Sequence, residues 1–520
     1  MVDSSGVTWT ASATVGNDPT VPAVYVKFKN SGGTEHPGLT AWFYADGCDV
    51  GATRADNAFD YTNCSLTVVY NATTVFTQTG VNFWRGARNQ TIRYGTQAAW
   101  VPVDLSLFPN WAKPATPLAP YNISKYDFSY NGDGFSTYPA MGTTGSRPEI
   151  AYVPQCDVPQ CVSPSDANFA VVRKVADNSG CWPVYFSDPT TGLPLDITQY
   201  PNATLITAAA GVYAGNPIVP YQNITAGQWK FTGSPFIPDE AHHPGYNFVA
   251  AASTGTARDK DHAAFWANFP LIAFNPAYRQ KTGVFQHYQE RGTAWALRSL
   301  FLASFVSSMP AYFSNQMNVM LGLANALPQN PLGWLNTYQR PGFNGSLSAI
   351  AEWEENYLRI VVEPIAQKLS AWKPFAQYLL SNIPIVLSGQ TYALSTLYVL
   401  TILDASGNPL PTWNDVLLAS LQDTHNSAWT LADAQAAIDP SATVASIYTL
   451  CQKYKMNVNQ VGDFLQYDTA PDDYPALMRA SAASAASLGV AGGAAAWTTA
   501  SSVPTQPVFT TEWAFNIVPR

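Results

Sequence analysis

The first hundred residues carry short runs of β-branched and aromatic residues. Three examples are 21–29, 66–70 and 91–94, and Gly, Asn and Asp separate such runs from one another. Branched and aromatic side chains fit the pleated surface of a strand, whereas Gly, Asn and Asp favour turns. The pattern therefore predicts a β-sandwich-like domain over residues 1–110.

After about residue 147 the apolar positions take the spacing of helices. Apolar residues at 169, 171, 172, 175 and 176 predict a short amphipathic helix, and an aspartate stands near the start of this run. Further helices are expected at 258–274, 290–307, 311–326, 347–371, 374–383, 390–403 and 441–454. Consecutive helices with short joints are typical of antiparallel hairpins. A ring of such hairpins would form an (α/α) toroid, predicted over residues 148–520.

Loop-rich stretches interrupt this pattern. Residues 111–147 are rich in Pro, Gly, Tyr and Asn and predict a connector or a lid, and 181–238 predicts an excursion near one mouth of the toroid. The Ala- and Ser-rich tail from about 480 predicts a helix, followed by looser packing at 492–496. The final apolar run, 508–518, predicts a strand-like end that docks on the body.

Composition narrows the classes of protein. The chain has 520 residues, of which 47% are hydrophobic, so two or three packed domains are expected. Its formal net charge of −9 provides no basic field for phosphates, which argues against nucleic acid as a partner. No apolar run is long enough to span a membrane, and the first residues lack the features of a secretory leader. Abundant Thr, Ser, Asn, Pro and Gly are common in extracellular proteins, so we expect an extracellular or virion-borne protein.

The six cysteines leave two interpretations open. In an oxidising compartment, Cys48 would pair with Cys64, and one bridge would form among Cys156, Cys161 and Cys181. In a reducing compartment all of them, with Cys451, would be buried thiols. Their spacing does not resemble that of a zinc site.

Ionisable and aromatic residues gather in three short clusters, at 239–246, 265–268 and 291–298. Only 12% of the residues are charged, so simple solvation does not account for this concentration. Each cluster lies near the start of a helix-like run, and adjacent helices could bring all three to one cavity wall. We therefore expect the candidate site in this part of the chain.

The same clusters carry a family resemblance. The chain resembles a poorly characterised group of bacterial and phage proteins, usually described as having a six-hairpin glycosidase-like toroid behind an N-terminal β domain. The resemblance covers mainly residues 145–300, with weaker likeness at 83–85 and 513–514, and it implies a fold more firmly than an activity. His243 stands where the group is expected to have glutamine, so His242 is the better site candidate. The motifs are GSRPEI (145–150), CWPVYFSD (181–188) with TG at 191–192, AHHP (241–244), FWAN (265–268), NPAYR (275–279) and RGTAWALR (291–298).

Two reaction types fit the residues of the clusters. A lyase acting on uronic acids needs a base and a group that stabilises the developing negative charge. A glycoside hydrolase needs two carboxyl groups on either side of the scissile bond. The lyase set is His242, Tyr246, Asn268, Arg291 and Arg147, and the hydrolase set is Asp239, Glu240 and Glu149. The expected substrate-binding residues are Trp182, Trp266, Trp295, His243 and Tyr185.

Each of these residues also has a structural interpretation. Asp239 could cap a helix, the histidines could bond to backbone groups in the core, and the tryptophans could be core residues. Arg291 and Arg298 lie on one helical face and could join helices through carboxylates such as Glu290 or Glu149. Neighbouring His242 and His243 diverge by about 100° on a helix, and no third ligand lies near them, so neither a metal nor another cofactor is expected.

The sequence as a whole favours an enzyme that cleaves an extracellular polysaccharide, with a lyase on a uronic-acid-containing glycan ahead of a glycoside hydrolase. His, Tyr, Asn and Arg are better represented in the clusters than paired carboxylates. The alternative from another class is a glycan-binding, adhesive or structural virion protein that does not cut. Polysaccharide is the expected partner, and self-association or assembly into a virion stays open.

Overall fold

The structure is a computed structural model, and it describes most of the chain beyond residue 98 together with the backbone of six strands nearer the N-terminus. The ranges described in full are residues 99–124, 151–201 except 181, 183, 187, 189–190 and 192, 242–273, 290–327, 329–334, 349–465, 474–509 and 513–520.

The six N-terminal strands form two antiparallel sheets. One has the order β1 (Trp9–Thr14), β4 (Tyr61–Tyr70) and β5 (Thr73–Phe83); the other has the order β2 (Tyr25–Asn30), β3 (Leu39–Tyr44) and β6 (Arg88–Tyr94). Strands therefore form at all three runs in which the sequence predicts them.

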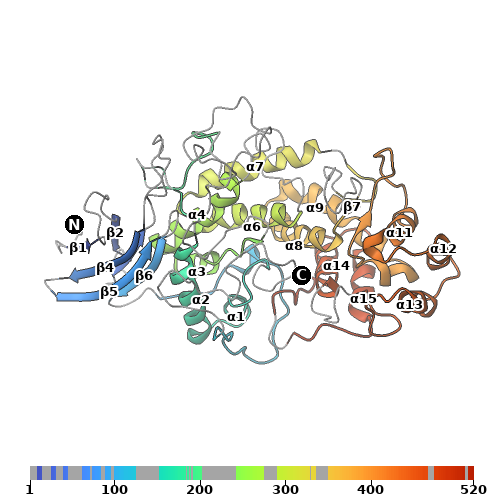
Figure 1. The fold of residues 1–520 in the computed structure, drawn as a ribbon, viewed down its shortest axis with the longest axis horizontal. Helices are drawn as coiled ribbons and strands as arrows, with labels where there is room; N and C mark the ends of the chain where they lie inside the picture. The colour runs from blue at the N-terminus through green and yellow to red at the C-terminus, as the bar shows by residue number, and fades with distance from the viewer. Residues whose placement is uncertain are drawn as a thin grey trace.

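Most of the remaining described residues belong to helices, and four of these helices form a buried middle layer. Each helix of the layer packs on the next in the order α4, α6, α8 and α14 (Figure 1). Nearly every side chain in these four helices is buried, including charged ones. Because no face is left to solvent, these helices lack the polar stripe of a surface helix. They are α4 (Ala257–Ala273), α6 (Glu290–Val306), α8 (Glu352–Lys368) and α14 (Tyr474–Ser487).

Other helices pack around this layer. The short α3 (Phe248–Thr254) precedes α4, α7 (Pro310–Ala326) forms a hairpin with α6, and α15 (Gly493–Ser502) forms one with α14. At the end of the layer nearer α4 lie α1 (Val158–Val162) and α2 (Asp166–Asn178), and beyond α8 come α9 (Lys373–Leu380) and α10 (Ile383–Val386).

Three short helices lie together at one end of the molecule (Figure 1). They are α11 (Trp413–Leu421), α12 (Leu431–Ile438) and α13 (Val444–Lys453). Each begins at a threonine, Thr412, Thr430 or Thr443, whose side chain accepts a hydrogen bond from a backbone N–H of the first turn. Such caps satisfy amide groups that have no partner within the helix, which helps helices this short to form.

The helix predictions hold for most of the chain, with two corrections. Residues 390–403 are not a helix: a 3-10 turn covers Gln390–Leu394, and Leu400–Thr401 (β8) pairs with Ala349–Ile350 (β7). Because residues 349–350 take part in this pairing, the helix predicted at 347–371 begins later in the sequence, at Glu352. Sequence periodicity missed this small sheet because each of its strands has only two residues.

The tail also packs more tightly than expected. Residues predicted to be loosely packed begin α15, and a Cβ placed on Gly493 would lie 2.8 Å from backbone atoms of Ala485 in α14. Glycine is needed there because the two helices approach closely. Farther along, Ile517 forms a single bridge with Trp111, and the Trp111 indole donates to the Ala514 carbonyl. The C-terminus thus docks on the body beside the start of the connector, although the described part of it forms no regular strand.

The cysteine group 156, 161 and 181 does not form the predicted bridge. Cys161 and Cys451 are free thiols, and Cys156 keeps its thiol near the Asp157 carboxylate. Any bridge within the group would need Cys156 or Cys161, so none forms. The side chains of Cys48, Cys64 and Cys181 lie outside the described residues. No helix in the described ranges has both the length and the apolar character required to cross a bilayer.

Asp157 beside these thiols provides a test of the buried packing. Burial raises the pKa of its carboxyl well above the usual range, with a smaller opposing effect from the Cys156 thiol. A carboxyl with a raised folded pKa contributes most to stability below its unfolded pKa, about 4, and this contribution is lost as the pH rises through the folded pKa. Asp157→Asn should therefore become more stable relative to the unmodified protein as the pH rises from about 4 to about 8.

The measurement is the midpoint of thermal unfolding for both proteins across that pH range. Asp439→Asn is the matched control, because hydrogen bonds from Ser441 lower the pKa of the exposed Asp439 carboxyl. Because a lowered pKa confines the pH-dependent contribution of Asp439 to values below about 4, the control should change little relative to the unmodified protein over this range. A parallel pH dependence of the two variants would contradict the buried, protonated state of Asp157.

Candidate functional site

The segment that contains His242 and His243 lies along one face of α6. Arg291 donates from Nη2 to Nε2 of His242 over 2.7 Å, and Arg298 donates to the His243 carbonyl over 2.7 Å. Arg291 and Arg298 are seven residues apart and so share a helical face, as the sequence predicted. Gly245, with a φ of 69°, turns the chain into α3; a Cβ there would lie about 3 Å from Phe248 and Arg298.

Arg298 is a structural residue. Its guanidinium is fully buried and donates to the carbonyls of Ala151, Tyr152 and His243. Burial lowers its pKa to about 9, so the group still carries its charge at neutral pH. Desolvation and the nearby Arg298 charge lower the pKa of His243 well below its usual range, which keeps this imidazole neutral. Arg298 thus joins segments through carbonyl oxygens rather than through a carboxylate.

Asn268 also has structural partners on both sides of its amide. Its nitrogen donates to the Leu195 carbonyl over 2.9 Å, and its oxygen accepts from the Tyr312 hydroxyl over 3.1 Å. These bonds tie α4 to the loop at 195 and to α7. The structure therefore brings His242 and Arg291 together, but it gives Asn268 a separate bonding network.

The predicted sugar-binding aromatics are core residues. Trp182, Trp266 and Trp295 are at most 1% exposed, and Tyr185 is 6% exposed. The Trp266 indole donates to the Tyr185 hydroxyl, whose oxygen also lies 2.9 Å from Nδ1 of His262. Tyr246 packs edge-on against Trp266. Rings enclosed in this way cannot stack on a sugar, because their faces are already covered by other side chains.

Four predicted residues lie outside the described part of the chain. They are Arg147, Glu149, Asp239 and Glu240. The carboxylates expected for a hydrolase thus have no described position.

Three aromatic rings extend from Arg291 across the N-terminal ends of α8 and α14. The Arg291 guanidinium lies 4.9 Å from the ring centre of Trp353, which stacks on Tyr474 at 5.4 Å and 4°. Tyr474 in turn stacks on Tyr398 at 6.5 Å and 11°. We call Trp353, Tyr474 and Tyr398 the aromatic row. It joins segments far apart in the sequence and ends at a pocket.

That pocket has a volume of about 210 Å³, and Tyr398 and Tyr474 form part of its wall. His425 also lines it, and Nδ1 of His425 lies 2.6 Å from the Asp423 carboxylate. Lys455 provides a cation at the same wall. We call this the Tyr398 pocket.

Sequence reasoning missed the aromatic row and the Tyr398 pocket. It also passed over Glu354 and Glu355, which are buried in the first turn of α8, and considered the buried Glu290 only as a partner for arginine. One signal was available: the run EWEE at 352–355 concentrates acids around a tryptophan in a chain poor in charge. Tyr398, His425 and Tyr474 lie in separate segments, and no spacing links them.

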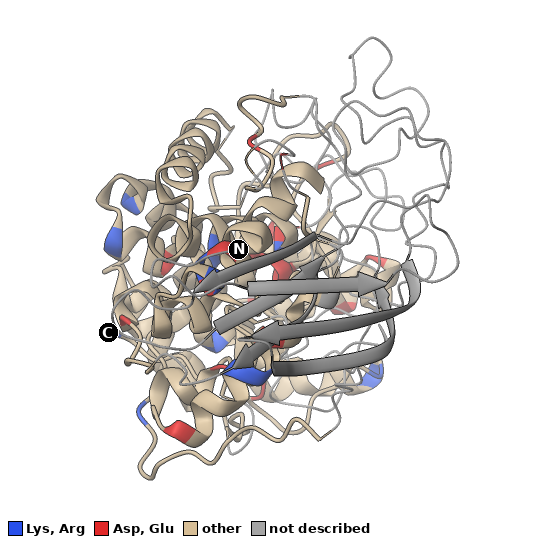
Figure 2. Cartoon of the chain, turned by 90° about the vertical axis from the view of Figure 1, so that its left-hand side faces the viewer, with Lys and Arg blue, Asp and Glu red and all other residues tan. Residues whose placement is uncertain are grey.

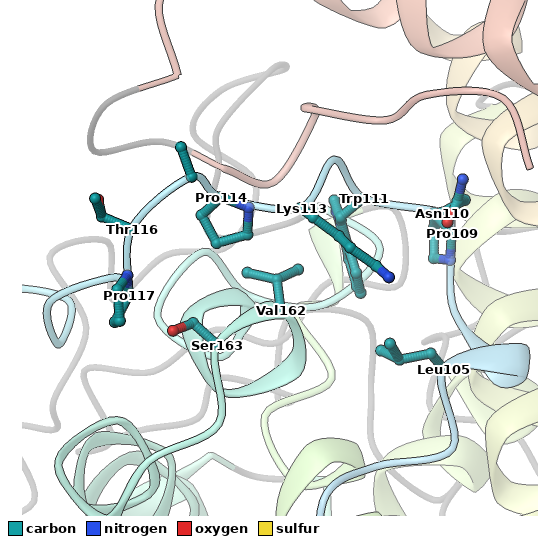
Figure 3. Close-up of a pocket in the computed structure, with 11 residues that line it drawn as sticks. Leu105, Pro109, Asn110, Trp111, Lys113, Pro114, Thr116, Pro117, Val162 and Ser163 are labelled. Carbon is teal, nitrogen blue, oxygen red and sulfur yellow. The ribbon is translucent and has the colours of Figure 1, made fainter.

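A second cavity, of about 330 Å³, is lined by residues of 105–117 and by Val162 and Ser163 at the end of α1 (Figure 3). Its described lining is mainly apolar and rich in proline, and Lys113 is the single charged residue in it. None of the predicted site residues lines it.

Charged positions elsewhere are scattered, with both signs intermixed over the described part of the chain (Figure 2). Within the described ranges no cluster of His, Cys, Asp and Glu has the arrangement of a metal site. Comparisons of the chain with family models, with curated proteins and with solved structures gave no match.

Proposed function

We propose that the protein cleaves a uronic-acid-containing polysaccharide by β-elimination, at a site beside Arg291 and His242. One observation carries the proposal: the Arg291 guanidinium is held between Nε2 of His242 and the face of Trp353, at the head of the aromatic row. A guanidinium matches the geometry of a carboxylate.

In this reaction a base removes the proton from the carbon next to the uronate carboxylate. The electron pair of that C–H bond forms a carbon–carbon double bond, the neighbouring C–O glycosidic bond breaks, and the leaving oxygen takes up a proton. Charge that develops on the carboxylate in the transition state needs a fixed cation beside it. Arg291 has that role in the proposal.

His242 is the proposed base. Its Nε2 now accepts a hydrogen bond from Arg291, so its lone pair is engaged. A substrate carboxylate that draws the guanidinium away would free Nε2 to accept a proton. Binding of the acidic sugar would then activate the base, because Arg291 would exchange its hydrogen bond to His242 for one to the substrate carboxylate.

The architecture that we propose around this site is the ring of hairpins suggested by the sequence resemblance, behind a β-sandwich-like domain. The serial packing of α4, α6, α8 and α14 supports it, since the inner helices of a toroid pack on their neighbours in chain order. The two antiparallel N-terminal sheets are compatible with a sandwich.

A second candidate function, glycan binding without cleavage in an extracellular or virion-borne protein, is favoured by burial. His242 is 5% and Arg291 2% exposed, so a substrate reaches them only if the residues that cover them move. The Tyr398 pocket at the other end of the row has the exposed residues Ser427 and Lys455 in its wall and needs no such movement.

The test is product formation on a panel of acidic and neutral polysaccharides. β-Elimination predicts ultraviolet absorbance from an unsaturated uronate together with new reducing ends, on acidic glycans alone. Reducing ends without that absorbance would replace the lyase by a hydrolase, for which the buried Glu290 and Glu354 would be the first carboxylates to test. Binding without any product would favour the second candidate.

A further inference from the structure

The Tyr398 pocket combines a cation, a histidine and an aromatic ring around a volume of about 210 Å³. Pockets for drug-sized ligands usually have about 300–1,000 Å³, so this volume suits a smaller ligand, such as one sugar ring. Its wall is built from three separate parts of the chain: 396–398, 425–427 and 455–457, with Leu465 and Tyr474 completing it.

His425 is held in one orientation. Its Nδ1 lies 2.6 Å from Oδ1 of Asp423, and its backbone N–H donates to the same oxygen over 2.8 Å. The next residue, Asn426, is buried and bonds to the backbone of Val399 and Ser420, which fixes the turn. With Nδ1 bound by the carboxylate, Nε2 is the nitrogen left for a ligand.

Lys455 provides positive charge at this wall. It is an exposed residue, and no carboxylate of the described residues lies within ion-pair distance of it. Lys453, two residues earlier, differs because it pairs with Asp433 over 2.6 Å. Of the two lysines, Lys455 is therefore the one whose charge is not neutralised by an acidic side chain.

The backbone around the pocket is strained. Ser427, Ala428 and Lys455 are the non-glycine residues with positive φ in the described part of the chain, at 75°, 45° and 56°. Ser427 and Lys455 both line the pocket. Such conformations cost on the order of 1–3 kcal/mol each and persist where the surrounding structure requires them, often at ligand sites. Two of these three residues thus stand in the wall of one pocket, and the third, Ala428, follows directly after Ser427.

We propose that the Tyr398 pocket is a subsite for a single uronate residue of an acidic glycan. Lys455 binds the carboxylate, His425 Nε2 bonds to the carboxylate or to a hydroxyl, and the ring of Tyr398 contacts the sugar. The inference rests on the proposed function for the class of glycan, and adds to it a second contact point at the far end of the aromatic row from Arg291.

The experiment is a titration of the full-length protein with glucuronate, galacturonate and glucose, monitored by NMR of the histidine ring protons. The His425 signal is assigned from its loss in His425→Gln. Both uronates should shift this signal in a saturable way, whereas glucose at the same concentration should leave it in place. A uronate that moves no His425 signal, or glucose that moves it equally, would overturn the subsite.

Lys455→Gln tests the cation, with Lys453→Gln as a control that removes the same charge from the same helix end. Loss of Lys455 should raise the Kd for uronate several-fold, up to about fivefold, which is the range of an exposed ion pair. Lys453→Gln should leave it within about 1.5-fold. Equal weakening by both variants would mean that only net charge matters, and would overturn the role of Lys455.

These results separate the subsite from the proposed function. Saturable uronate binding at His425 without any cleavage product supports the subsite and removes the lyase. Cleavage of an acidic glycan with no uronate-dependent change at His425 supports the lyase and removes the subsite.

Discussion

Arg291→Ala is expected to lower the turnover of an acidic polysaccharide by about 10²–10³-fold, the cost of losing one fixed donor that stabilises developing negative charge. His242→Ala is expected to lower it by about 10²–10⁴-fold, since a general base contributes that much. The measurement is the initial rate of formation of unsaturated uronate. The two losses should not multiply in the double variant, because in this proposal Arg291 and His242 act as a pair joined by a 2.7 Å hydrogen bond.

Arg291→Lys serves as the matched control. It keeps the charge but not the planar guanidinium that lies over Trp353, so its rate should fall between those of the unmodified protein and Arg291→Ala. Thermal unfolding of each variant shows whether the fold is kept. Folded variants of both Arg291 and His242 with undiminished turnover would remove this pair from the mechanism.

Local patterns predicted the helices well because the relevant information lies within one turn. The apolar spacing of α4 and α6 placed both within a residue or so of their observed bounds. The same geometry put Arg291 and Arg298 on one face of α6. The sequence did not predict the hydrogen-bond partner of either arginine: Arg291 donates to His242, and Arg298 donates to the backbone carbonyls of residues 151 and 152.

The scarcity of charge was a weaker guide to function than expected. Several buried charged residues join segments of the fold: Arg359 in α8 donates to the Leu379 carbonyl in α9, and Asp259 in α4 pairs with Arg173 in α2. A buried ion pair and a catalytic pair have the same residue types, and only their surroundings separate them. The same holds for the neutral Asn268, whose role depends on hydrogen-bond partners that local sequence does not reveal: Leu195 and Tyr312 are 73 and 44 residues away.

The aromatic row could not be predicted from the sequence either, because its contacts join residues that are far apart along the chain. Trp353, Tyr398 and Tyr474 come from three segments, and their stacking depends on how α8 and α14 pack. Of the tryptophans chosen from the sequence, Trp266 and Trp295 stand in the middle of the buried helices α4 and α6, and Trp182 stands in a buried loop.

Arg298→Met is expected to lower the free energy of unfolding by about 3–5 kcal/mol, among the larger effects of single substitutions. The guanidinium donates to three carbonyl oxygens, those of Ala151, Tyr152 and His243, and lies 4.9 Å from the ring centre of Trp295. Methionine fills much of the volume but donates no hydrogen bond, and each buried acceptor left without a partner costs about 1–3 kcal/mol. Because the segments that contain residues 151–152 and 242–243 are joined through this side chain, its loss should also expose the His242 segment to faster amide exchange.

The measurement is urea unfolding at neutral pH, with Arg479→Met as the matched control. Arg479 likewise lies beside aromatic rings, those of Trp497 and Phe509, but it is only partly buried. Within the described residues its guanidinium makes one long hydrogen bond, of 3.4 Å, to the Ile517 carbonyl. The control should therefore lose only about 1 kcal/mol. A loss as small as this in Arg298→Met would mean that water can satisfy the three carbonyls, and that Arg298 does not hold the segment of His242 and His243 against α6.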